Sequence, residues 1–399
     1  MTIPEHVKSM KKDRVAEPRR IELFIRRQVA HGQDLIQGIT QYARPAKNWI
    51  FGIQSPDFAV IRKTLTSRPN GVIAQVGREE LHRLLENSGI PYVDLAQTLP
   101  DDSIMRVCVD HEAIGKMAAE YFIQNRFREF GFVGEANHRF SLLRESGYVQ
   151  TLRDRGYECH ILRRNILQIF QPSLAIAETD TRLAKWLMRL PLPIALFAVT
   201  DFRGMKVLEM CRKLGLKVPA EVAVLGVDND ALFCNLEHPP LSSIAQPSHE
   251  MGYQAAKMLD ALMAGETVKR RQIALPPLRV VVRQSSDITA VNDKLVADAL
   301  AFIRAHAGEP ITVKDVCREV LVSRRLLEMR FQKELNCTPL EEIRRTRIAR
   351  AKQLLTDTDR PMSEIAKNSG FQSSARFSVV FHQYTGITPI AYRGKFRNH

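Results

Sequence analysis

The sequence predicts a doubly wound α/β region with two lobes, followed by an all-α region. Short apolar runs rich in β-branched residues alternate with amphipathic helical segments from the start of the chain. This alternation ends near residue 285, and the segments that follow have helical periodicity. A chain of 399 residues also exceeds what one hydrophobic core usually supports, so at least two domains are expected.

The α/β region contains eight apolar runs that we interpret as buried parallel strands, because strands covered by helices on both faces are apolar throughout. Helical periodicity separates them, for example over residues 33–42, 111–125 and 203–214. So many βα units predict two similar lobes, with a ligand crevice between them beyond the carboxyl ends of the strands. The eight runs are residues 21–25, 49–53, 71–76, 91–95, 105–109, 130–134, 194–199 and 222–227.

A further apolar run, residues 278–282, leads into the polar stretch 283–287 and is expected to be the last strand. The predicted domain organisation follows from this change of composition. It consists of an N-terminal tail (residues 1–19), a two-lobed effector-binding domain (20–285), a linker (286–293) and a helical domain (294–397).

The helical region contains an internal repeat. Residues 312–317 match residues 361–366 at an offset of 49, and after one inserted residue the offset becomes 50. Each copy predicts a short helix, a tight turn and a second helix, and a helix over about residues 340–355 joins the copies. At the second offset Ser323, Leu327, Phe331, Asn336, Thr338 and Pro339 coincide with Ser373, Phe377, Phe381, Gly386, Thr388 and Pro389.

Local signals support these helix boundaries. Thr312 with Asp315 resembles a capping box, and Pro361 suits the first turn of a helix. Gly370, Asn336 and Gly386 tolerate the left-handed conformation that ends a helix. Four connector residues are expected to face inward: Ile343, Ile348, Ala351 and Leu354.

The second helix of each copy is predicted to read DNA, because a helix fits the major groove, where base edges carry a distinguishable donor and acceptor pattern. Leu327 and Phe331, and likewise Phe377 and Phe381, take the core side, which exposes the opposite faces. Arg can fork onto guanine, Glu can accept from cytosine, and Ser and Ala suit shape and thymine methyl contacts. The predicted DNA-binding residues are Arg324, Arg325, Glu328, Met329, Ser374, Ala375, Arg376 and Ser378. The connector arginines Arg344, Arg345, Arg347 and Arg350 fit either phosphate contact or a solvated face.

The basic charge fits a polyanionic partner such as nucleic acid or an anionic membrane face, and also a surface that serves only solubility. The formal net charge is +14, and residues 291–399 hold 19 Lys and Arg against 12 Asp and Glu. The six cysteines lie at least 20 residues apart, which excludes a CxxC redox pair or a compact zinc site, and no metal or cofactor is predicted. No signal-peptide h-region or apolar run of transmembrane length is found. We therefore expect a cytoplasmic, nucleoid-associated protein with no membrane partner.

Residues 294–397 resemble the AraC-type DNA-binding domain, on the basis of the two helix-turn-helix copies and the Thr-Pro pair after each second helix. In that family the two reading helices enter successive major grooves on one face of double-stranded DNA. The resemblance implies a transcription regulator, with RNA polymerase as a further partner.

The two-lobed region resembles the LacI-type, periplasmic-binding-protein-like effector domain. The stretches 107–110 (VCVD), 144–148 (RESGY), 198–201 (AVTD) and 225–229 (LGVDN) stand in the order and strand context of that family. The combination with an AraC-type domain is similar to the bacterial xylose operon activators, above all over residues 241–246 and 251–257. This resemblance implies a sugar effector, activation of carbohydrate-utilisation genes and a homodimer formed through the sensor lobes.

The predicted effector site has chemistry suited to a polyol, because carboxylates accept hydrogen bonds from adjacent hydroxyls and a guanidinium donates two in a fixed plane. Asp201 and Asp228 follow strands at their carboxyl ends, and Arg144 opens the helix after the run 130–134. Asp110 also ends a strand. The alternative for each Asp is the capping of the next helix.

The loop after the first strand, residues 26–32, departs from the xylose-type pattern. It contributes Arg26 and His31 to the predicted site, but Gly32 stands where that family carries an Asp. Arg26 and Arg27 fit either an acidic sugar or solvated positions. The sequence therefore leaves xylose, another sugar and an acidic sugar open.

Two other functions are weighed against regulation. A sugar-processing enzyme would need Asp110-His111 or Ser248-His249 as a catalytic pair, but adjacent side chains diverge and no nucleophile or nucleotide motif occurs. An enzyme is therefore not expected. A sugar-binding protein whose helical domain mediates protein interaction differs from a DNA-binding regulator in salt dependence. The expected mechanism is that ligand closes the lobes and shifts the spacing of two DNA-binding domains.

Overall fold

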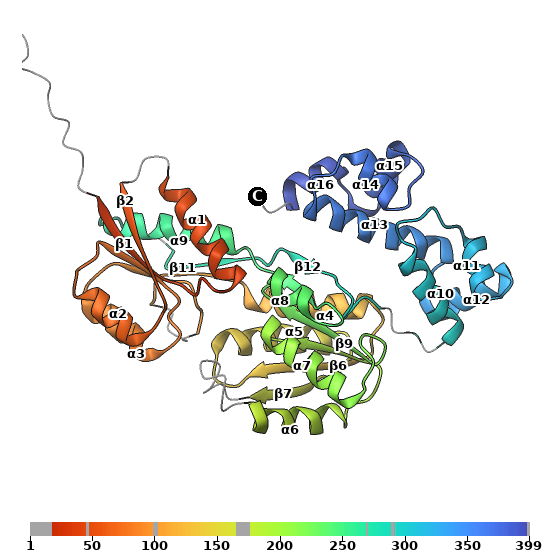
Figure 1. The fold of residues 1–399 in the computed structure, drawn as a ribbon, viewed down its shortest axis with the longest axis horizontal. Helices are drawn as coiled ribbons and strands as arrows, with labels where there is room; N and C mark the ends of the chain where they lie inside the picture. Colours follow the sequence, from red (N-terminus) through yellow and green to blue (C-terminus); the bar gives the residue numbers. More distant parts are fainter. Residues whose placement is uncertain are drawn as a thin grey trace, which may run out of the picture.

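The computed structural model consists of two α/β lobes and a separate helical domain (Figure 1). Each lobe is a sheet with helices on both faces, and the helical domain follows the second lobe in the chain. Within the described part, no helix is both long and apolar enough to cross a membrane. The structure describes residues 18–44, 48–98, 103–164, 176–268, 270–288, 291 and 293–396.

The first lobe contains a parallel sheet in the order β11-β5-β4-β3-β1-β2. Side chains alternate between its faces: Leu23 packs with helices α1 and α9, whereas the next residue, Phe24, packs with α2 and α3. The strands are β1 (Arg19–Phe24), β2 (Trp49–Gln54), β3 (Gly71–Ala74), β4 (Tyr92–Asp94), β5 (Arg106–Val109) and β11 (Gln272–Leu275). The helices are α1 (Ala30–Ala43), α2 (Phe58–Leu65), α3 (Glu79–Ser88) and α9 (Ser248–Met263).

The second lobe repeats this plan in the order β12-β10-β9-β8-β6-β7. Helices α4 and α5 cover one face of its sheet, and α6, α7 and α8 cover the other. The strands are β6 (Glu129–Glu135), β7 (His160–Arg164), β8 (Ile194–Ala198), β9 (Val222–Val227), β10 (Ser242–Ala245) and β12 (Arg279–Val281). The helices are α4 (His111–Gln124), α5 (Arg139–Arg153), α6 (Ile176–Leu187), α7 (Asp201–Leu214) and α8 (Ala231–Leu236).

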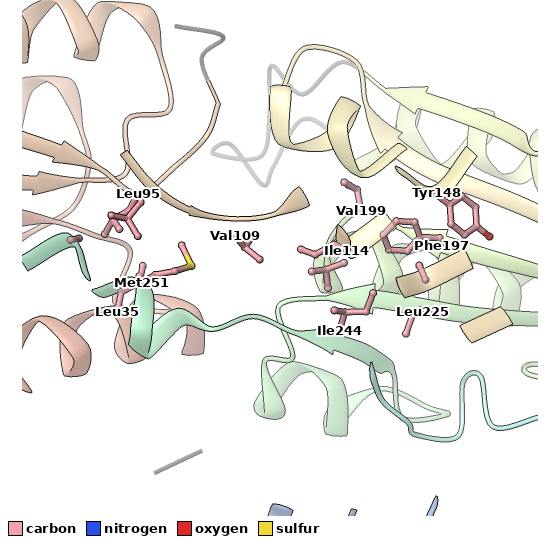
Figure 2. Packing of buried hydrophobic residues seen from close by; sticks show 14 of the residues in the cluster. Leu35, Leu95, Val109, Ile114, Tyr148, Phe197, Val199, Leu225, Ile244 and Met251 are labelled. Carbon is pink, nitrogen blue, oxygen red and sulfur yellow. The ribbon is translucent and has the colours of Figure 1, made fainter. Parts of the chain in front are cut away.

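The chain crosses between the lobes three times, at Asp110, at residues 246–247 and at residues 276–278. Because β5, β10 and β11 end at these crossovers, the carboxyl ends of both sheets meet there. One hydrophobic cluster continues across the junction, from Leu35 in the first lobe past Val109 to Phe197 in the second (Figure 2).

All eight predicted strands are present, with ends shifted by two residues at most. The expected burial of residues 49–53 is wrong, because β2 is the edge of its sheet and Ile50 is 56% exposed. The prediction missed β7, β10 and β11. The run 278–282 contains β12, which pairs antiparallel with β10. The sequence pattern does not predict β10, because Ser242 and Ser243 are polar and interrupt the apolar run. Both serines are fully buried and hydrogen-bonded.

The helical domain contains two helix-turn-helix units, as predicted. The first half of α13 packs into the first core through Ile343, and its second half packs into the second core through Ile348 and Ala351. Leu354 is only partly buried, and Leu355 is fully buried. The helices are α10 (Lys294–Ala305), α11 (Val313–Glu319), α12 (Arg324–Leu335), α13 (Pro339–Asp357), α14 (Met362–Asn368), α15 (Ser374–Thr385) and α16 (Pro389–Phe396).

The predicted capping box and left-handed helix ends are confirmed by their geometry, whereas Pro361 precedes the first turn of α14 and does not lie in it. The Asp315 carboxylate accepts hydrogen bonds from the Thr312 N–H at 2.8 Å and its hydroxyl at 2.7 Å. Asn336 and Gly386 are left-handed, with φ of 50° and 75°, at the ends of the two reading helices. Gly370, with φ of 71°, follows α14 in the turn of the second unit.

Strand β1 begins at Arg19 and α10 begins at Lys294. Residues 1–17 of the predicted tail, residues 289, 290 and 292 of the predicted linker, and residue 397 lie outside the described residues. Ser285 and Ser286, which flank the start of that linker, are buried against the second lobe. Ser285 donates to the Val224 carbonyl at 2.7 Å, and Ser286 contacts the Tyr121 hydroxyl at 2.8 Å.

Candidate functional site

Arg144 lies in the second turn of α5, near the crossovers, and is only 3% exposed. The prediction that Arg144 opens this helix is wrong, because the helix begins at Arg139. Its Nε donates to Nδ1 of His111 at 3.2 Å, and its Nη1 donates to the Val199 carbonyl. Its guanidinium carbon lies 5.2 Å from the centre of the Phe140 ring. Burial lowers the pKa of Arg144, while the charge of Asp228 raises it most strongly. Among the described residues no carboxylate forms an ion pair with this guanidinium, which leaves it donors for a ligand.

Asp228 follows β9 in a strained backbone conformation. Its φ is 115°, and Asn229 next to it has a φ of 51°, values that non-glycine residues rarely adopt. Gln246, at the second crossover, donates to Oδ1 of Asp228. Burial raises the pKa of Asp228, and Arg144 opposes that shift. The other oxygen, Oδ2, accepts no hydrogen bond from the described residues, so it is an available acceptor.

Asp201 is engaged within the second lobe. Its Oδ1 accepts from the Ser243 hydroxyl at 2.5 Å, and its Oδ2 accepts from the Asp230 N–H at 2.9 Å and from Sγ of Cys234 at 3.3 Å. Burial, followed by the charge of Asp228, raises the pKa of Asp201 well above its usual range. These contacts fit a residue that positions the loop carrying Asp228.

His31 and Arg26 bring the first lobe to this site. Nδ1 of His31 hydrogen-bonds with the Ser248 hydroxyl at 2.7 Å. Burial, and then the charges of Arg144 and Arg26, lower the pKa of His31 to about 4, so the ring is neutral at pH 7. Burial also lowers the pKa of Arg26, whose backbone N–H donates to Oε1 of Gln75 at 3.0 Å. His31 follows Ala30, whose N–H donates to Oδ2 of Asp230 in the second lobe at 2.9 Å, so this loop lies at the junction of the lobes.

The departure from the xylose-type pattern at Gly32 has a structural reason. A Cβ at this position would lie 1.9 Å from the carbonyl oxygen of Arg26. An Asp at position 32 would therefore require the backbone of this loop to move. Arg27, in the same loop, is exposed.

The lobes are joined directly by Asp230. Its Oδ2 accepts from the Ala30 N–H, at the start of α1, at 2.9 Å. Its Oδ1 accepts from the Leu232 and Phe233 N–H groups, at 3.1 and 3.3 Å, and so caps α8. One carboxylate thus ties together the first turns of two helices in different lobes.

The remaining predicted residue, Asp110, caps α4 by accepting from the Ala113 N–H at 3.0 Å. Sequence reasoning missed Glu135 and Arg203, whose side chains form a buried ion pair of 3.2 Å, and His138, which lies 3.1 Å from the same carboxylate. Glu135 directly follows the predicted strand 130–134, and Arg203 lies in the first turn of α7. Their positions next to strand ends were the available signal.

The first reading helix, α12, begins after its cap Ser323, whose hydroxyl accepts from the Leu326 N–H at 3.3 Å. Leu327 and Phe331 are fully buried. Of the predicted DNA-binding residues on this helix, Arg324, Arg325 and Met329 are exposed and Glu328 is half-buried. Nε of Arg324 forms an ion pair of 2.7 Å with Glu328, which holds both side chains on the outer face.

The second reading helix, α15, repeats this arrangement. Ser373 caps it by accepting from the Arg376 N–H at 3.3 Å, and Phe377 and Phe381 are fully buried. Ala375, Arg376 and Ser378 are exposed, and Ser374 is half-buried. The repeat therefore presents two capped helices that each bury an aromatic face and expose a short polar one.

The connector arginines differ from one another. Arg347 donates to the carbonyls of Glu309 and Ile311 at 3.1 and 2.8 Å, and Nε of Arg350 donates to the Asn368 carbonyl at 2.6 Å. Burial lowers the pKa of Arg347. These two side chains stabilise the fold, whereas Arg345 is exposed and pairs with Glu342 at 3.0 Å.

Neither a metal cluster nor a catalytic pair emerges in the described ranges. They contain no group of three or more His, Cys, Asp or Glu placed to hold a metal ion. Asp110 caps α4 and His111 accepts from Arg144, while Ser248 hydrogen-bonds with His31. These four side chains are thus engaged in contacts that hold helix ends and the candidate site.

Comparison with known proteins supports both halves of the chain. Residues 119–286 match a periplasmic binding protein-like domain, and residues 316–395 match a helix-turn-helix domain. The xylose operon regulatory protein of Escherichia coli K12 is 30% identical over 384 residues, which cover 94% of this chain and 96% of that protein. Its counterpart in Haemophilus influenzae is 29% identical and is covered to 98%.

A solved structure of the xylose-binding transcription activator xylR is also similar. It superposes with a TM-score of 0.63 at 28% sequence identity, over 96% of this chain and 100% of that one. These relatives are regulators of transcription. Their similarity to this chain argues against the alternative function of a sugar-processing enzyme. The chain belongs to the family of xylose operon regulatory proteins, transcription regulators that join a periplasmic-binding-protein-like sensor to a C-terminal helix-turn-helix domain.

Proposed function

We propose that this regulator responds to a sugar-like molecule held between its lobes, at the cluster formed by Arg144, Asp228, Arg26 and His31. The observation that carries this proposal is the pair Arg144 and Asp228. The guanidinium has no ion-pair partner and one carboxylate oxygen accepts no hydrogen bond among the described residues. A molecule with adjacent hydroxyls satisfies both groups at once.

We assign the other predicted residues supporting roles. Asp201 positions the loop of Asp228, and Asp110 caps α4 next to His111. The bond between Ala30 and Asp230 favours a closed arrangement of the lobes, so ligand that touches both lobes stabilises that arrangement further.

Xylose is the first candidate ligand, because the relatives named above are xylose regulators. An acidic sugar is the second candidate. It is favoured by Arg26 and Arg144, whose charges both act on His31, and by the absence of a carboxylate at position 32.

At the DNA, we propose that α12 and α15 enter successive major grooves. Arg324, Arg325, Glu328 and Met329 are the proposed contacts of the first helix, and Ser374, Ala375, Arg376 and Ser378 those of the second. The proposed working form is a cytoplasmic homodimer, bound in the nucleoid, that activates transcription through RNA polymerase.

A thermal-shift measurement on the full chain tests the effector site. D-Xylose, D-glucose and D-glucuronate are compared, because bound ligand raises the apparent melting temperature by mass action. Arg144→Gln should abolish the shift caused by the active sugar, whereas Arg153→Gln, at the far end of α5, should leave it unchanged. A shift with D-glucuronate that Arg26→Gln removes would establish the acidic ligand, and no shift with any sugar would contradict the proposal.

The salt dependence of binding to duplex DNA tests the proposed DNA-binding role of the helical domain. The logarithm of the association constant should fall steeply with the logarithm of salt concentration, with a slope of about −0.9 for each phosphate contact. Arg324→Ala combined with Arg376→Ala should make the slope shallower. A binding constant that is insensitive to salt would favour protein interaction as the role of the helical domain.

A further inference from the structure

Helix α4 connects the candidate effector site with the helical domain. Its 14 residues span about 20 Å. Its first residue, His111, accepts the hydrogen bond from Nε of Arg144 at 3.2 Å. Towards its other end, the Tyr121 hydroxyl contacts the Ser286 carbonyl at 3.0 Å. Arg126, which follows the helix, donates from Nη2 to the backbone carbonyl of Leu335 in the helical domain.

Backbone contact locks α4 to α5, the helix that carries Arg144. A Cβ on Gly115 of α4 would lie 2.1 Å from the carbonyl oxygen of Arg144. A Cβ on Gly147 of α5 would lie 2.1 Å from the carbonyl oxygen of Glu112. Since no side chains separate the helices at these points, a displacement of Arg144 has to move the first turns of α4 with it.

The far end of this connection is the end of the first reading helix. Leu335 is the last residue of α12, and the carbonyls at a helix C-terminus lack helical partners and attract cations. Beside this contact lies a cavity of about 230 Å³, lined by Arg126 and by Cys337, Glu341 and Glu342 of the helical domain. Arg345 also lines this cavity and forms an ion pair of 3.0 Å with Glu342, so Glu341 is the carboxylate that adds charge complementarity to Arg126.

A second contact holds the same helix-turn-helix unit. Asp287, next to the Ser286 that Tyr121 binds, lies 3.7 Å from Nε of Arg304 on α10. Helix α10 packs into the core of the first unit with α11 and α12. Two contacts with this unit thus lie close to the last turn of α4, one made by Arg126 and the other by Asp287 of the predicted linker.

We propose that Arg126 and the end of α4 form a docking surface for the first helix-turn-helix unit, and that α4 couples this docking to the effector site. Ligand that repositions Arg144 thereby changes how α12 is held. The coupling rests on the proposed effector site, whereas the docking contact does not.

Alkylation of Cys337 in the full chain, followed by mass spectrometry of its peptide, tests the docking. Arg126→Ala should speed the reaction roughly two- to fivefold, as expected for the loss of one charge-assisted hydrogen bond at a partly exposed site. Burial raises the pKa of the Cys337 thiol and Arg126 opposes that shift, so loss of this positive charge by itself would slow the reaction. An increase therefore reports opening of the contact.

Two controls define that result. Arg128→Ala removes an exposed arginine two residues away and should leave the rate at Cys337 unchanged. Cys317, on α11 of the same unit, should be alkylated at the same rate in the wild type and in every variant. An unchanged rate at Cys337 in Arg126→Ala would overturn the docking surface.

His111→Ala tests the coupling without any ligand, because it removes the partner of Arg144 at the start of α4. The rate at Cys337 should change in this variant and stay constant in Glu112→Ala, its exposed neighbour. If Arg126→Ala speeds alkylation and His111→Ala does not, the coupling through α4 is wrong. If no sugar raises the melting temperature, the proposed effector site is contradicted. The docking contact of Arg126 does not depend on that result and is tested separately by the alkylation rate.

Discussion

Leu321 occupies a turn position that is taken by glycine in the other half of the repeat. Its φ is 53°, and at the offset of 49 residues it matches Gly370, whose φ is 71°. The left-handed region costs a side chain with a Cβ about 1–2 kcal/mol, and glycine avoids this cost. Leu321 is 89% exposed, so packing does not compensate for the strain.

Leu321→Gly should therefore raise the free energy of unfolding of the helical domain by about 0.5–1 kcal/mol, after the extra chain entropy of glycine is counted. Urea denaturation of the full chain, followed by the helical signal, measures this. The matched variant Gly370→Ala should destabilise by about 1–3 kcal/mol, because its Cβ would also lie 2.5 Å from the carbonyl oxygen of Glu309. A loss of stability in Leu321→Gly would show that the leucine side chain makes a contact of its own.

The buried carboxyl groups Asp201 and Asp228 make stability depend on pH. Burial raises the pKa of both, so the folded state retains protons that the unfolded chain releases above about pH 4. The stability that this retention contributes is complete below that pH. It is lost as the pH rises through the raised values in the folded state.

Asp201→Asn should accordingly flatten the fall in melting temperature between about pH 5 and about pH 8, because it removes one of the two titrating groups. The asparagine carbonyl can still accept from the Asp230 N–H, and its amide can donate to Ser243. Asp260→Asn, a change at a carboxylate that pairs with Arg19 near the surface, serves as the control. An identical pH profile in wild type and Asp201→Asn would show that Asp201 is ionised throughout.

At the scale of elements, α13 combines two tasks. Its apolar residues divide between two cores, and its arginines reach carbonyls of neighbouring segments. Arg347 binds the carbonyls of Glu309 and Ile311, just before α11, and Arg350 binds that of Asn368 at the end of α14. The connector thereby fixes both helix-turn-helix units to one rigid axis.

Arg347→Ala should lower the free energy of unfolding of the helical domain by about 1–3 kcal/mol, because it leaves the partly buried Ile311 carbonyl without its charged donor. Arg344→Ala, three residues earlier on the same helix, should change it by no more than about 0.5 kcal/mol. Urea denaturation monitored by circular dichroism compares the two. Equal stability of both variants would contradict a structural role of Arg347 and leave solvation or phosphate binding as its role.

At the scale of the molecule, the helical domain has its own hydrophobic cores. Their buried residues run from Val296 to Phe381, without a contribution from either lobe. The sensor and the predicted linker reach this domain through a few polar contacts, among them those of Arg126 and Asp287. Such an interface adds little to the stability of either side.

A fragment of residues 291–399 should therefore fold alone and unfold in one cooperative transition, within a few degrees of the corresponding transition in the full chain. Differential scanning calorimetry of the fragment and the full chain makes the comparison. A broad transition without an enthalpy peak in the fragment would show that the sensor is needed to complete the fold.

The order of strands and helices and the duplicated helix-turn-helix unit were determined by the sequence alone. Both depend on patterns within a few neighbouring residues, such as apolar runs, caps and left-handed ends. For the same reason the spacing of the repeat is enough to match Ser323 with Ser373. Strands β7, β10 and β11 were the exceptions. The serines of β10 are polar by type and become suitable for a sheet centre only through distant partners.

The roles of the charged residues were decided only by the tertiary structure. Asp201 and Asp228 look alike in the sequence, yet one is enclosed by Ser243 and Cys234 and the other keeps a free oxygen among the described residues. Asp230 joins Ala30, 200 residues away, and Arg126 reaches Leu335, 209 residues away. A hydrogen bond depends on the distance between side chains in space, and local sequence patterns carry no record of partners so far along the chain.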